Sequence, residues 1–390
     1  MKTVLTAERL FTSTGILSAP ILVIEEGRIL SVGSRATSEV PAGAREVAFA
    51  DNILAPGFVD IHIHGGAGHD VMNADADALA VIERSLAARG VTSYFPTTVT
   101  APLDATYIAL ERLAAAIETA DVRLSRNGGL RAQPLGIHLE GPFLSHAKRG
   151  VHPPQHLQEP SLEIFDRMWQ AARGNVSVMT IAPELPNAEN LIAEAARRGV
   201  CVSVGHSDAT AEETQAAISA GARHATHTFN AMRALDHREP GIAGVVLSDD
   251  RLSAELICDG IHVRPEVVKL WYRAKGPDRA VLVTDAISAT GMGDGRYQLG
   301  GFEVEVRGDR CEYEGRLAGS VLTLDRAVRN VMEFASIGLA DAVRLATLNP
   351  ARVAGVSGRK GALTEGADAD IVVLSPRGEV VKTIVRGQGI

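Results

Sequence analysis

The feature that most constrains the fold is a long alternation of apolar runs with alanine-rich stretches, which fills the middle of the 390-residue chain. The apolar runs have the length of buried strands, and the stretches between them fit helices. Several of these helices should stop at glycine, as at Gly90, Gly199 and Gly221. Eight strands alternating with helices predict an α/β fold, a parallel (β/α)8 TIM barrel. The expected strands are 58–62, 91–95, 135–140, 177–182, 202–205, 224–227, 254–258 and 280–285. The expected helices are 77–88, 104–117, 188–198, 211–220, 265–274, 324–334 and 339–348.

Both ends of the chain show a different pattern, of short strands joined by turns. Residues 21–33 hold two apolar runs around Gly27, and residues 369–386 hold two more around a Pro-Arg-Gly turn. Neither end is long enough to form a good core alone. We therefore expect residues 1–55 and 356–390 to pack together as one small β-sandwich domain, beside a barrel domain of residues 56–355.

Composition excludes several classes of function. A formal net charge of -8 argues against sequence-independent binding to nucleic acid, which needs a basic face. The three cysteines are far apart and form no C-x-x-C pair, so we expect no disulfides and a reducing compartment. The N-terminus lacks the apolar run of a signal peptide, and no stretch approaches the ~18 apolar residues of a membrane span. These features predict a cytoplasmic protein without membrane or nucleic-acid partners.

The strongest local signal is PGFVDIHIHGG at residues 56–66. His62 and His64 are two residues apart, so on a strand their side chains point to the same face. Two neutral imidazoles on one face can share a metal ion. A pair of structural histidines near a strand end is the alternative. The following Gly-Gly lets the backbone approach closely and favours the metal site.

Polar side chains also close the later strands. Alone, Glu140 could be a solvated loop residue and Asp285 a helix N-cap. Because the carboxyl ends of barrel strands meet at the face that carries the active site, their repetition there indicates function. His224 precedes its strand end by three residues and is expected to be structural. The candidate residues, in chain order, are Glu140, His206, His227, His262 (in a loop) and Asp285.

This set of side chains supports metal-assisted hydrolysis. A divalent metal lowers the pKa of a bound water from ~15.7 to about 7 and polarises a carbonyl. Asp285 could take the proton of that water and return it to the leaving group. The sequence has neither a G-x-S-x-G nucleophile elbow nor a P-loop. The glycine-rich residues 291–295 are expected to form a flexible loop.

Taken together, the motifs resemble the N-acetylglucosamine-6-phosphate deacetylase family of the amidohydrolase superfamily, over essentially the full length. The segments that carry the resemblance are PGFVDIHIHGG, GIHLEGPF, KRGVHPP, VGHSDAT, THTFNAM, REPGIAG, CDGIHV, VTDA and LAGS. The resemblance implies that Glu140, His206 and His227 bind a divalent metal. Members of the family that keep both His62 and His64 bind a second metal, so one or two per subunit are expected. Zinc suits this N4O ligand set best, and iron, cobalt or manganese also fit.

The resemblance further implies Asp285 as catalytic acid/base, N-acetylglucosamine 6-phosphate as substrate, and a homodimer with the phosphate site near the partner subunit. Arg238 is the expected phosphate partner, because a guanidinium forks onto phosphate oxygens. His262 would hold a sugar hydroxyl or the amide carbonyl, and Ala318 and Gly319 would line the acetyl pocket. The other implied substrate contacts are His152, Asn230 and Ala231.

Two alternatives stay open. One is another N-acyl deacylase of the same fold, acting on a different amino sugar or on an N-acyl amino acid. The other is an inactive relative, which would bind no metal and release no acetate. A cyclic-amide hydrolase is disfavoured, because the fourth expected strand, SVMTIAPE, lacks the lysine whose carboxylated form bridges two metals in those enzymes. Glu140 is expected to bridge instead.

Overall fold

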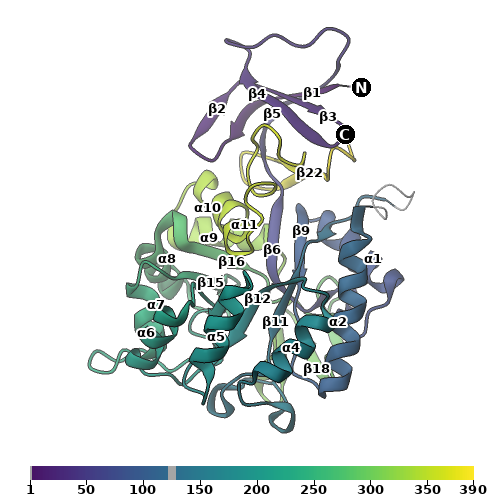
Figure 1. Ribbon diagram of the computed structural model, residues 1–390. Coiled ribbons are helices and arrows are strands. Elements are labelled where there is room, and N and C mark those ends of the chain that lie inside the picture. Colours follow the sequence, from purple (N-terminus) through teal and green to yellow (C-terminus); the bar gives the residue numbers. More distant parts are fainter. Residues whose placement is uncertain (1, 122–128) are drawn as a thin grey trace.

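The computed structural model describes residues 2–121 and 129–390 and contains parallel strands surrounded by helices (Figure 1). Two parallel sheets form the centre, with the strand orders β10-β9-β6 and β11-β12-β13-β14-β15-β16. Their strands are β6 (Phe58–Ile63), β9 (Val91–Pro96), β10 (Gln133–Pro134), β11 (Ile137–Glu140), β12 (Val176–Ile181), β13 (Cys201–Val204), β14 (His224–Ala225), β15 (Ser253–Ile257) and β16 (Ala280–Val283).

Isolated parallel bridges join the two sheets at both edges. Thr97, just after β9, pairs with His138 of β11. Ile63 of β6 pairs with Ala286, which follows β16. The strands therefore form a curved parallel array in chain order. This arrangement confirms the predicted α/β class, and each of the eight expected strands overlaps an observed one.

The helices cover the outside of this array, and side chains fill its interior, so the strands are buried on both faces. All six residues of β6 and all six of β9 are buried, as expected for parallel strands between a filled interior and a helical layer. The described helices are α1 (Ala76–Ala87), α2 (Leu103–Glu118), α4 (Leu162–Ala171), α5 (Ala188–Arg197), α6 (Ala211–Ala220), α7 (Gly241–Ser248), α8 (Pro265–Arg279), α9 (Leu324–Ala335), α10 (Leu339–Leu345) and α11 (Leu348–Val353). Only α4, α7 and the short α11 were not expected as separate helices. None of the described helices is long and apolar enough to cross a membrane.

The two ends of the chain form one mixed sheet, seen at the top of Figure 1. Its strand order is β22-β21-β5-β1-β3-β4, with β2 paired to β1. The structure thus confirms that both ends pack together. It shows them as a single sheet, and the sandwich arrangement stays a prediction. The strands are β1 (Thr3–Phe11), β2 (Ile16–Ser18), β3 (Pro20–Glu25), β4 (Arg28–Ser34), β5 (Arg45–Pro56), β21 (Ile371–Leu374) and β22 (Val380–Ile384).

A buried lysine ties the terminal sheet to the parallel strands. The Lys360 ammonium lies 2.6 Å from an Asp370 carboxylate oxygen and 3.0 Å from one of Asp368. It also donates to Oε1 of Gln133, on β10, at 2.8 Å. Because Lys360 is only 2% exposed, these contacts replace its hydration completely.

A small antiparallel sheet follows β16, where only a loop was expected. It consists of β17 (Gly295–Leu299), β18 (Phe302–Arg307), β19 (Arg310–Tyr313) and β20 (Arg316–Leu317). Burial alternates along β18, with Val304 and Val306 inward and charged residues outward. The inward face packs on Val99 and Ile287 beside the carboxyl ends of the parallel strands. Of the loop expected at residues 291–295, only residues 291–294 lie outside a strand, because β17 begins at Gly295.

Candidate active site

The polar residues expected at strand ends come together at one end of the parallel array. Glu140 is the last residue of β11. His206, His227 and Asp285 each lie two residues beyond β13, β14 and β16, respectively. All four side chains are buried. The carboxyl ends of parallel strands therefore gather them into one site, as the strand pattern predicted.

Three of these residues have a left-handed backbone conformation, which turns the chain sharply after each of the three strands. The φ angles are 47° at His206, 24° at His227 and 50° at Asp285. Such angles are strained for residues with a Cβ and persist only where the surroundings hold them. The carbonyl of Asp285 accepts from the Ser320 amide at 2.7 Å, and the carbonyl of His206 accepts from the Ser145 amide at 3.0 Å. Backbone contacts therefore fix the direction of the side chains.

Glu140 is the centre of the site. Its Oε1 lies 3.1 Å from Nε2 of His227 and 3.2 Å from Nε2 of His206. Its Oε2 lies 3.2 Å from Nε2 of His64. The two carboxylate oxygens therefore face two different groups of histidines.

His62 and His64 form the second group with Asp285. The Nε2 atoms of His62 and His64 lie 3.3 Å apart. Oδ1 of Asp285 lies 3.1 Å from Nε2 of His64 and 3.7 Å from Nε2 of His62. The ligand atoms of these three residues all lie within 4.8 Å of one another. His62 also approaches Oε1 of Glu140 at 3.4 Å, so the two groups meet at that carboxylate.

The hydrogen bonds of the outer ring nitrogens show that the site suits a divalent cation. Nδ1 of His64 faces the Thr97 carbonyl at 3.1 Å, and Nδ1 of His206 faces the Lys148 carbonyl at 3.0 Å. Because a carbonyl only accepts, each Nδ1 carries a proton, and in the neutral ring that binds a metal each Nε2 offers a lone pair. These lone pairs and the oxygens of Glu140 converge, which is repulsive unless positive charge lies among them. The donor set fits a divalent metal ion.

The pKa shifts show the same demand for positive charge. Burial alone would lower the pKa of His64, but hydrogen bonds to Asp285 and Glu140 raise it to about 9. Burial would raise the pKa of Glu140, yet His62 and the neighbouring rings hold it well below its usual range. Burial lowers the pKa of His206 to about 4, against the pull of Glu140, so this ring is neutral, as a metal ligand must be.

A cavity of about 330 Å³ opens over these side chains. Most of the residues expected to contact substrate line it, and Gly319 lies directly beside Asp285. A Cβ at Gly319 would come within 2.4 Å of Ile287, so only glycine fits at this wall. The predicted residues that line the cavity are His64, Glu140, His152, His206, His227, Asn230, Ala231, His262, Asp285 and Gly319.

Three predicted residues do not line the cavity. His62 is fully buried behind its wall. Ala318 is also buried, in the apolar cluster beneath the small antiparallel sheet. Arg238 lies on an exposed segment, where its amide donates to Asp236. Lys148 and Arg316, which sequence reasoning did not select, supply the cationic side chains among the described lining residues.

Neighbouring residues fix the orientation of two histidines in the cavity. Nδ1 of His262 lies 2.6 Å from Oδ2 of Asp259. Nδ1 of His152 lies 2.8 Å from the Thr100 hydroxyl. The Nε2 atom of His262 is therefore left for the cavity side, whereas Nε2 of His152 faces Oε2 of Glu140 at 3.5 Å.

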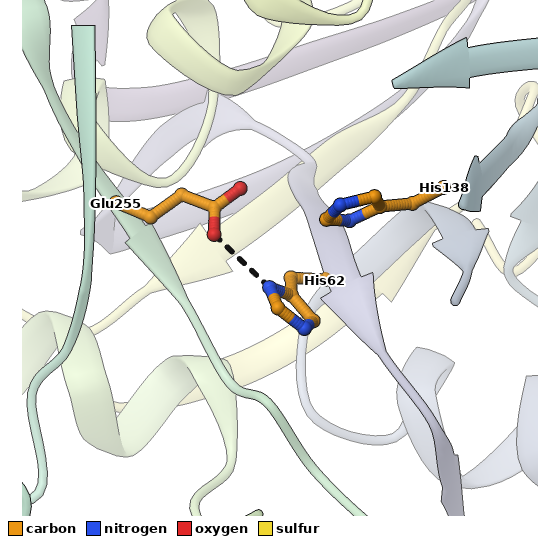
Figure 2. Close-up of side chains that lie close together, drawn as sticks. All are labelled: His62, His138 and Glu255. Carbon is orange, nitrogen blue, oxygen red and sulfur yellow. Dashed lines mark hydrogen bonds and ion pairs between the residues drawn. The ribbon is translucent and has the colours of Figure 1, made fainter. Parts of the chain in front are cut away.

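Sequence reasoning missed two buried polar residues behind the site, Glu255 and His138, which flank His62 (Figure 2). Glu255, on β15, lies 3.0 Å from Nδ1 of His62. His138, on β11, packs edge-on against His62 with ring centroids 4.6 Å apart. It bonds the Ile61 carbonyl and the Thr180 hydroxyl, and burial lowers its pKa to about 3. A charged residue inside an otherwise apolar strand was the signal that could have revealed Glu255.

Comparison with known proteins agrees with this fold and this site. The amidohydrolase family model matches residues 53–390. An N-acetylgalactosamine-6-phosphate deacetylase from Escherichia coli O157:H7 is 39% identical, covering 100% of this chain and 99% of its own. An N-acetylglucosamine-6-phosphate deacetylase from Bacillus subtilis is 36% identical, covering 96% and 94%. The mutant N-acetyl-D-glucosamine-6-phosphate deacetylase from Mycobacterium smegmatis, solved in complex with N-acetyl-D-glucosamine-6-phosphate, superposes with a TM-score of 0.90 at 36% identity, covering 99% and 98%.

The fold, the buried cluster of histidines and carboxylates, and the family match define an amidohydrolase. Family members of similar length share between 36% and 39% of their residues with it across nearly the whole chain. The chain belongs to the N-acetylglucosamine-6-phosphate deacetylase family of the amidohydrolase superfamily. It is a hydrolytic enzyme of amino-sugar metabolism.

Proposed function

We propose that this protein hydrolyses N-acetyl-D-glucosamine 6-phosphate to D-glucosamine 6-phosphate and acetate, in amino-sugar catabolism. The observation that carries the proposal is the cavity, whose wall combines a buried cluster of metal-ligand type with a carboxylate beside it, Asp285. Relatives that cover 96% and 97% of this chain carry this activity in their names. A cavity of about 330 Å³ is of the size that encloses a small ligand.

We assign the divalent metal to Glu140, His206 and His227, with His62 and His64 able to hold a second ion beside Asp285. Glu140 faces both groups and is suited to bridge them. Zinc suits this ligand set best, although iron, cobalt and manganese share its preferences. A bound divalent metal would make a water molecule acidic and polarise the acetamide carbonyl.

Asp285 is the general acid and base of the proposed reaction. Among the described residues that line the cavity, only Glu140 and Asp285 are acidic. Both oxygens of Glu140 face imidazoles, so Asp285 is the carboxylate left to accept a proton. As the water oxygen bonds to the acetyl carbon, Asp285 takes the water proton. It then delivers that proton to the amide nitrogen as the C–N bond breaks, which releases the amine and acetate.

The remaining cavity residues would bind and orient the sugar. His262, held by Asp259, is placed to bond a sugar hydroxyl or the amide carbonyl. Gly319 borders Asp285, where the acetyl group would lie, with the buried Ala318 supporting that wall from behind. His152, Asn230 and Ala231 complete the proposed contacts.

Arg238 and a homodimer remain part of the proposal. Within one chain, Arg238 lies on an exposed segment away from the cavity. The contact between Arg238 and the phosphate would be supplied by a movement of this segment or by the copy of Arg238 from a partner subunit. The second option agrees with the expected homodimer.

We also propose that the two parallel sheets act as one closed (β/α)8 barrel. The bridges at Thr97–His138 and Ile63–Ala286 support closure at both edges. The proposed barrel domain is 56–355, and the small β-domain is 1–55 with 356–390. The buried contacts of Lys360 support a firm attachment between the two.

A second candidate substrate is N-acetylgalactosamine 6-phosphate. It is favoured by the 39% identical relative from Escherichia coli O157:H7, which carries that activity in its name. The two substrates differ only in the configuration of one sugar hydroxyl, so they would present the same acetamide and phosphate to the site.

The test is acetate release by the purified, zinc-loaded protein from four compounds. These are N-acetylglucosamine 6-phosphate, N-acetylgalactosamine 6-phosphate, unphosphorylated N-acetylglucosamine and an N-acetyl amino acid. We expect the highest kcat/KM on the first. A higher value on the second would move the assignment to the galacto sugar, and a higher value on either unphosphorylated compound would overturn the proposal.

A further inference from the structure

Glu255 is a buried carboxylate with an unusual set of partners. It lies on β15 behind the cavity, its exposed fraction is 0%, and it does not line the cavity. No lysine or arginine of the described residues forms an ion pair with it; its partners are two imidazoles and one backbone amide. An isolated buried charge is very costly, so a carboxylate in this position needs positive charge close by.

The first contact of Glu255 sets the tautomer of His62. Its Oε2 lies 3.0 Å from Nδ1 of His62, and this pair is drawn in Figure 2. A carboxylate can only accept, so Nδ1 carries the proton and the Nε2 lone pair points toward Glu140 and Asp285. The negative charge also makes the ring a stronger electron donor at Nε2.

The second contact reaches the other group of ligands through the backbone. The same Oε2 accepts from the backbone N–H of His227 at 3.2 Å. His227 has a left-handed φ of 24°, and its Nδ1 has no hydrogen-bond partner among the described residues. The Nδ1 atoms of His64 and His206, in contrast, are each held by a carbonyl. Glu255 thus holds the strained backbone of His227, whose Nδ1 has no such support among the described residues.

The third contact fixes Glu255 itself. Its Oε1 lies 3.0 Å from Nε2 of His224, and Nδ1 of His224 lies 2.7 Å from the Ser253 hydroxyl. The carboxylate is therefore held at both oxygens and cannot rotate away from His62.

We propose that Glu255 is a positioning residue that holds His62 and His227, from the two halves of the site, in their metal-binding arrangement, and whose charge strengthens metal binding. This inference rests on the proposed metal site, but not on the identity of the substrate. The proposal predicts that the affinity for the metal depends on Glu255, although this carboxylate does not line the cavity.

The test compares Glu255→Gln with Glu83→Gln. Glutamine has the shape of glutamate and can still accept from His62, so the first variant removes mainly the charge. Glu83 is equally buried, at 1% exposure, but belongs to α1 and contacts Tyr94 and Arg131, away from the histidines. The measurement is the zinc dissociation constant of each purified protein by competition with a coloured chelator, without any substrate.

We expect Glu255→Gln to bind zinc about 10- to 100-fold more weakly than the wild type, and Glu83→Gln to bind it as the wild type does. Equal affinity in all three proteins, or an equal loss in both variants, would overturn the inference. If Glu255→Gln does not fold, Glu255→Asp decides, because it keeps the charge but is one methylene too short to hold both partners. A loss in affinity supports the inference and an unchanged affinity overturns it. Wild type that binds zinc but releases no acetate would refute the proposed function alone.

Discussion

Replacing Asp285 by asparagine should nearly abolish turnover while leaving the site assembled. Asparagine has the same size and can still face Nε2 of His64, which lies 3.1 Å from Oδ1. It cannot accept a proton from water. The other acidic residue of the cavity, Glu140, already faces imidazoles with both oxygens and is not free to replace it. The whole contribution of the general base should therefore be lost.

A general base contributes about 10²- to 10⁴-fold to a rate. At about 1.4 kcal/mol per factor of ten, this corresponds to about 3–5 kcal/mol of transition-state stabilisation. We expect kcat to fall by that factor, with KM changed less than about threefold, because proton transfer belongs to the transition state. The assay is steady-state acetate release from N-acetylglucosamine 6-phosphate.

Two controls make the result decisive. Asp325→Asn also removes a buried carboxylate, but on α9, where its partner is Arg329, and should leave kcat unchanged. The zinc content of Asp285→Asn should stay within a factor of two of the wild type. The assignment of Asp285 fails if this variant and the wild type turn over equally, or if the loss is explained by lost metal.

Three further results are expected. Arg238→Ala should raise KM for the phosphorylated sugar about tenfold or more, since a charge-assisted hydrogen bond contributes about 1.5–3 kcal/mol. The same variant should leave the turnover of the unphosphorylated sugar unchanged, and equal effects on both sugars would show that Arg238 does not bind the phosphate. Lys360→Met should lower the free energy of unfolding by about 3–5 kcal/mol in urea titrations, because it removes the cation that pairs with the buried carboxylate of Asp370. Lys2→Met, at an exposed position, should change the free energy of unfolding by less than about 0.5 kcal/mol, and equal effects of the two variants would refute the buried cluster. Burial would raise the pKa of Asp368, but Lys360 and Arg359 hold it below the ordinary value of 3.8, so its contribution to stability is present above pH 4 and is lost as the pH falls further. Thermal unfolding of Asp368→Asn should therefore depend less on pH between 5 and 3 than that of the wild type, and parallel curves would contradict this.

The parts of the fold that could be predicted from sequence are those governed by local patterns. The parallel strands are buried on both faces, so each appears as a short apolar run such as β16. α4 has an ordinary amphipathic pattern capped by Ser161 and could have been predicted. α7 could not, because its sequence GIAGVVLS is nearly all apolar and shows no helical periodicity. The small antiparallel sheet was not predicted, because the glycines before it indicated a loop, although polar and apolar residues alternate clearly along β18.

The candidate site was predictable where a polar residue ends a strand or closely follows it, because that position brings the side chains to a common face. The residues behind it were not. Glu255 is one acidic residue in an apolar run, and in the sequence it cannot be distinguished from a glutamate exposed to solvent at the edge of a strand. Its partners His62 and His227 come from β6 and the end of β14, so its role depends on contacts between distant segments. The contact of Arg238 with the phosphate stays a prediction, because Arg238 does not line the cavity within one chain.

The most direct test of the account is acetate release from N-acetylglucosamine 6-phosphate before and after metal removal. The protein would be assayed as purified, after exhaustive treatment with a chelator, and after zinc is added back. We predict turnover in the first state, loss of at least about 99% of it in the second, and recovery in the third, because the lone pairs around Glu140 converge on a position that needs a cation. Undiminished acetate release by the metal-free protein would contradict the account.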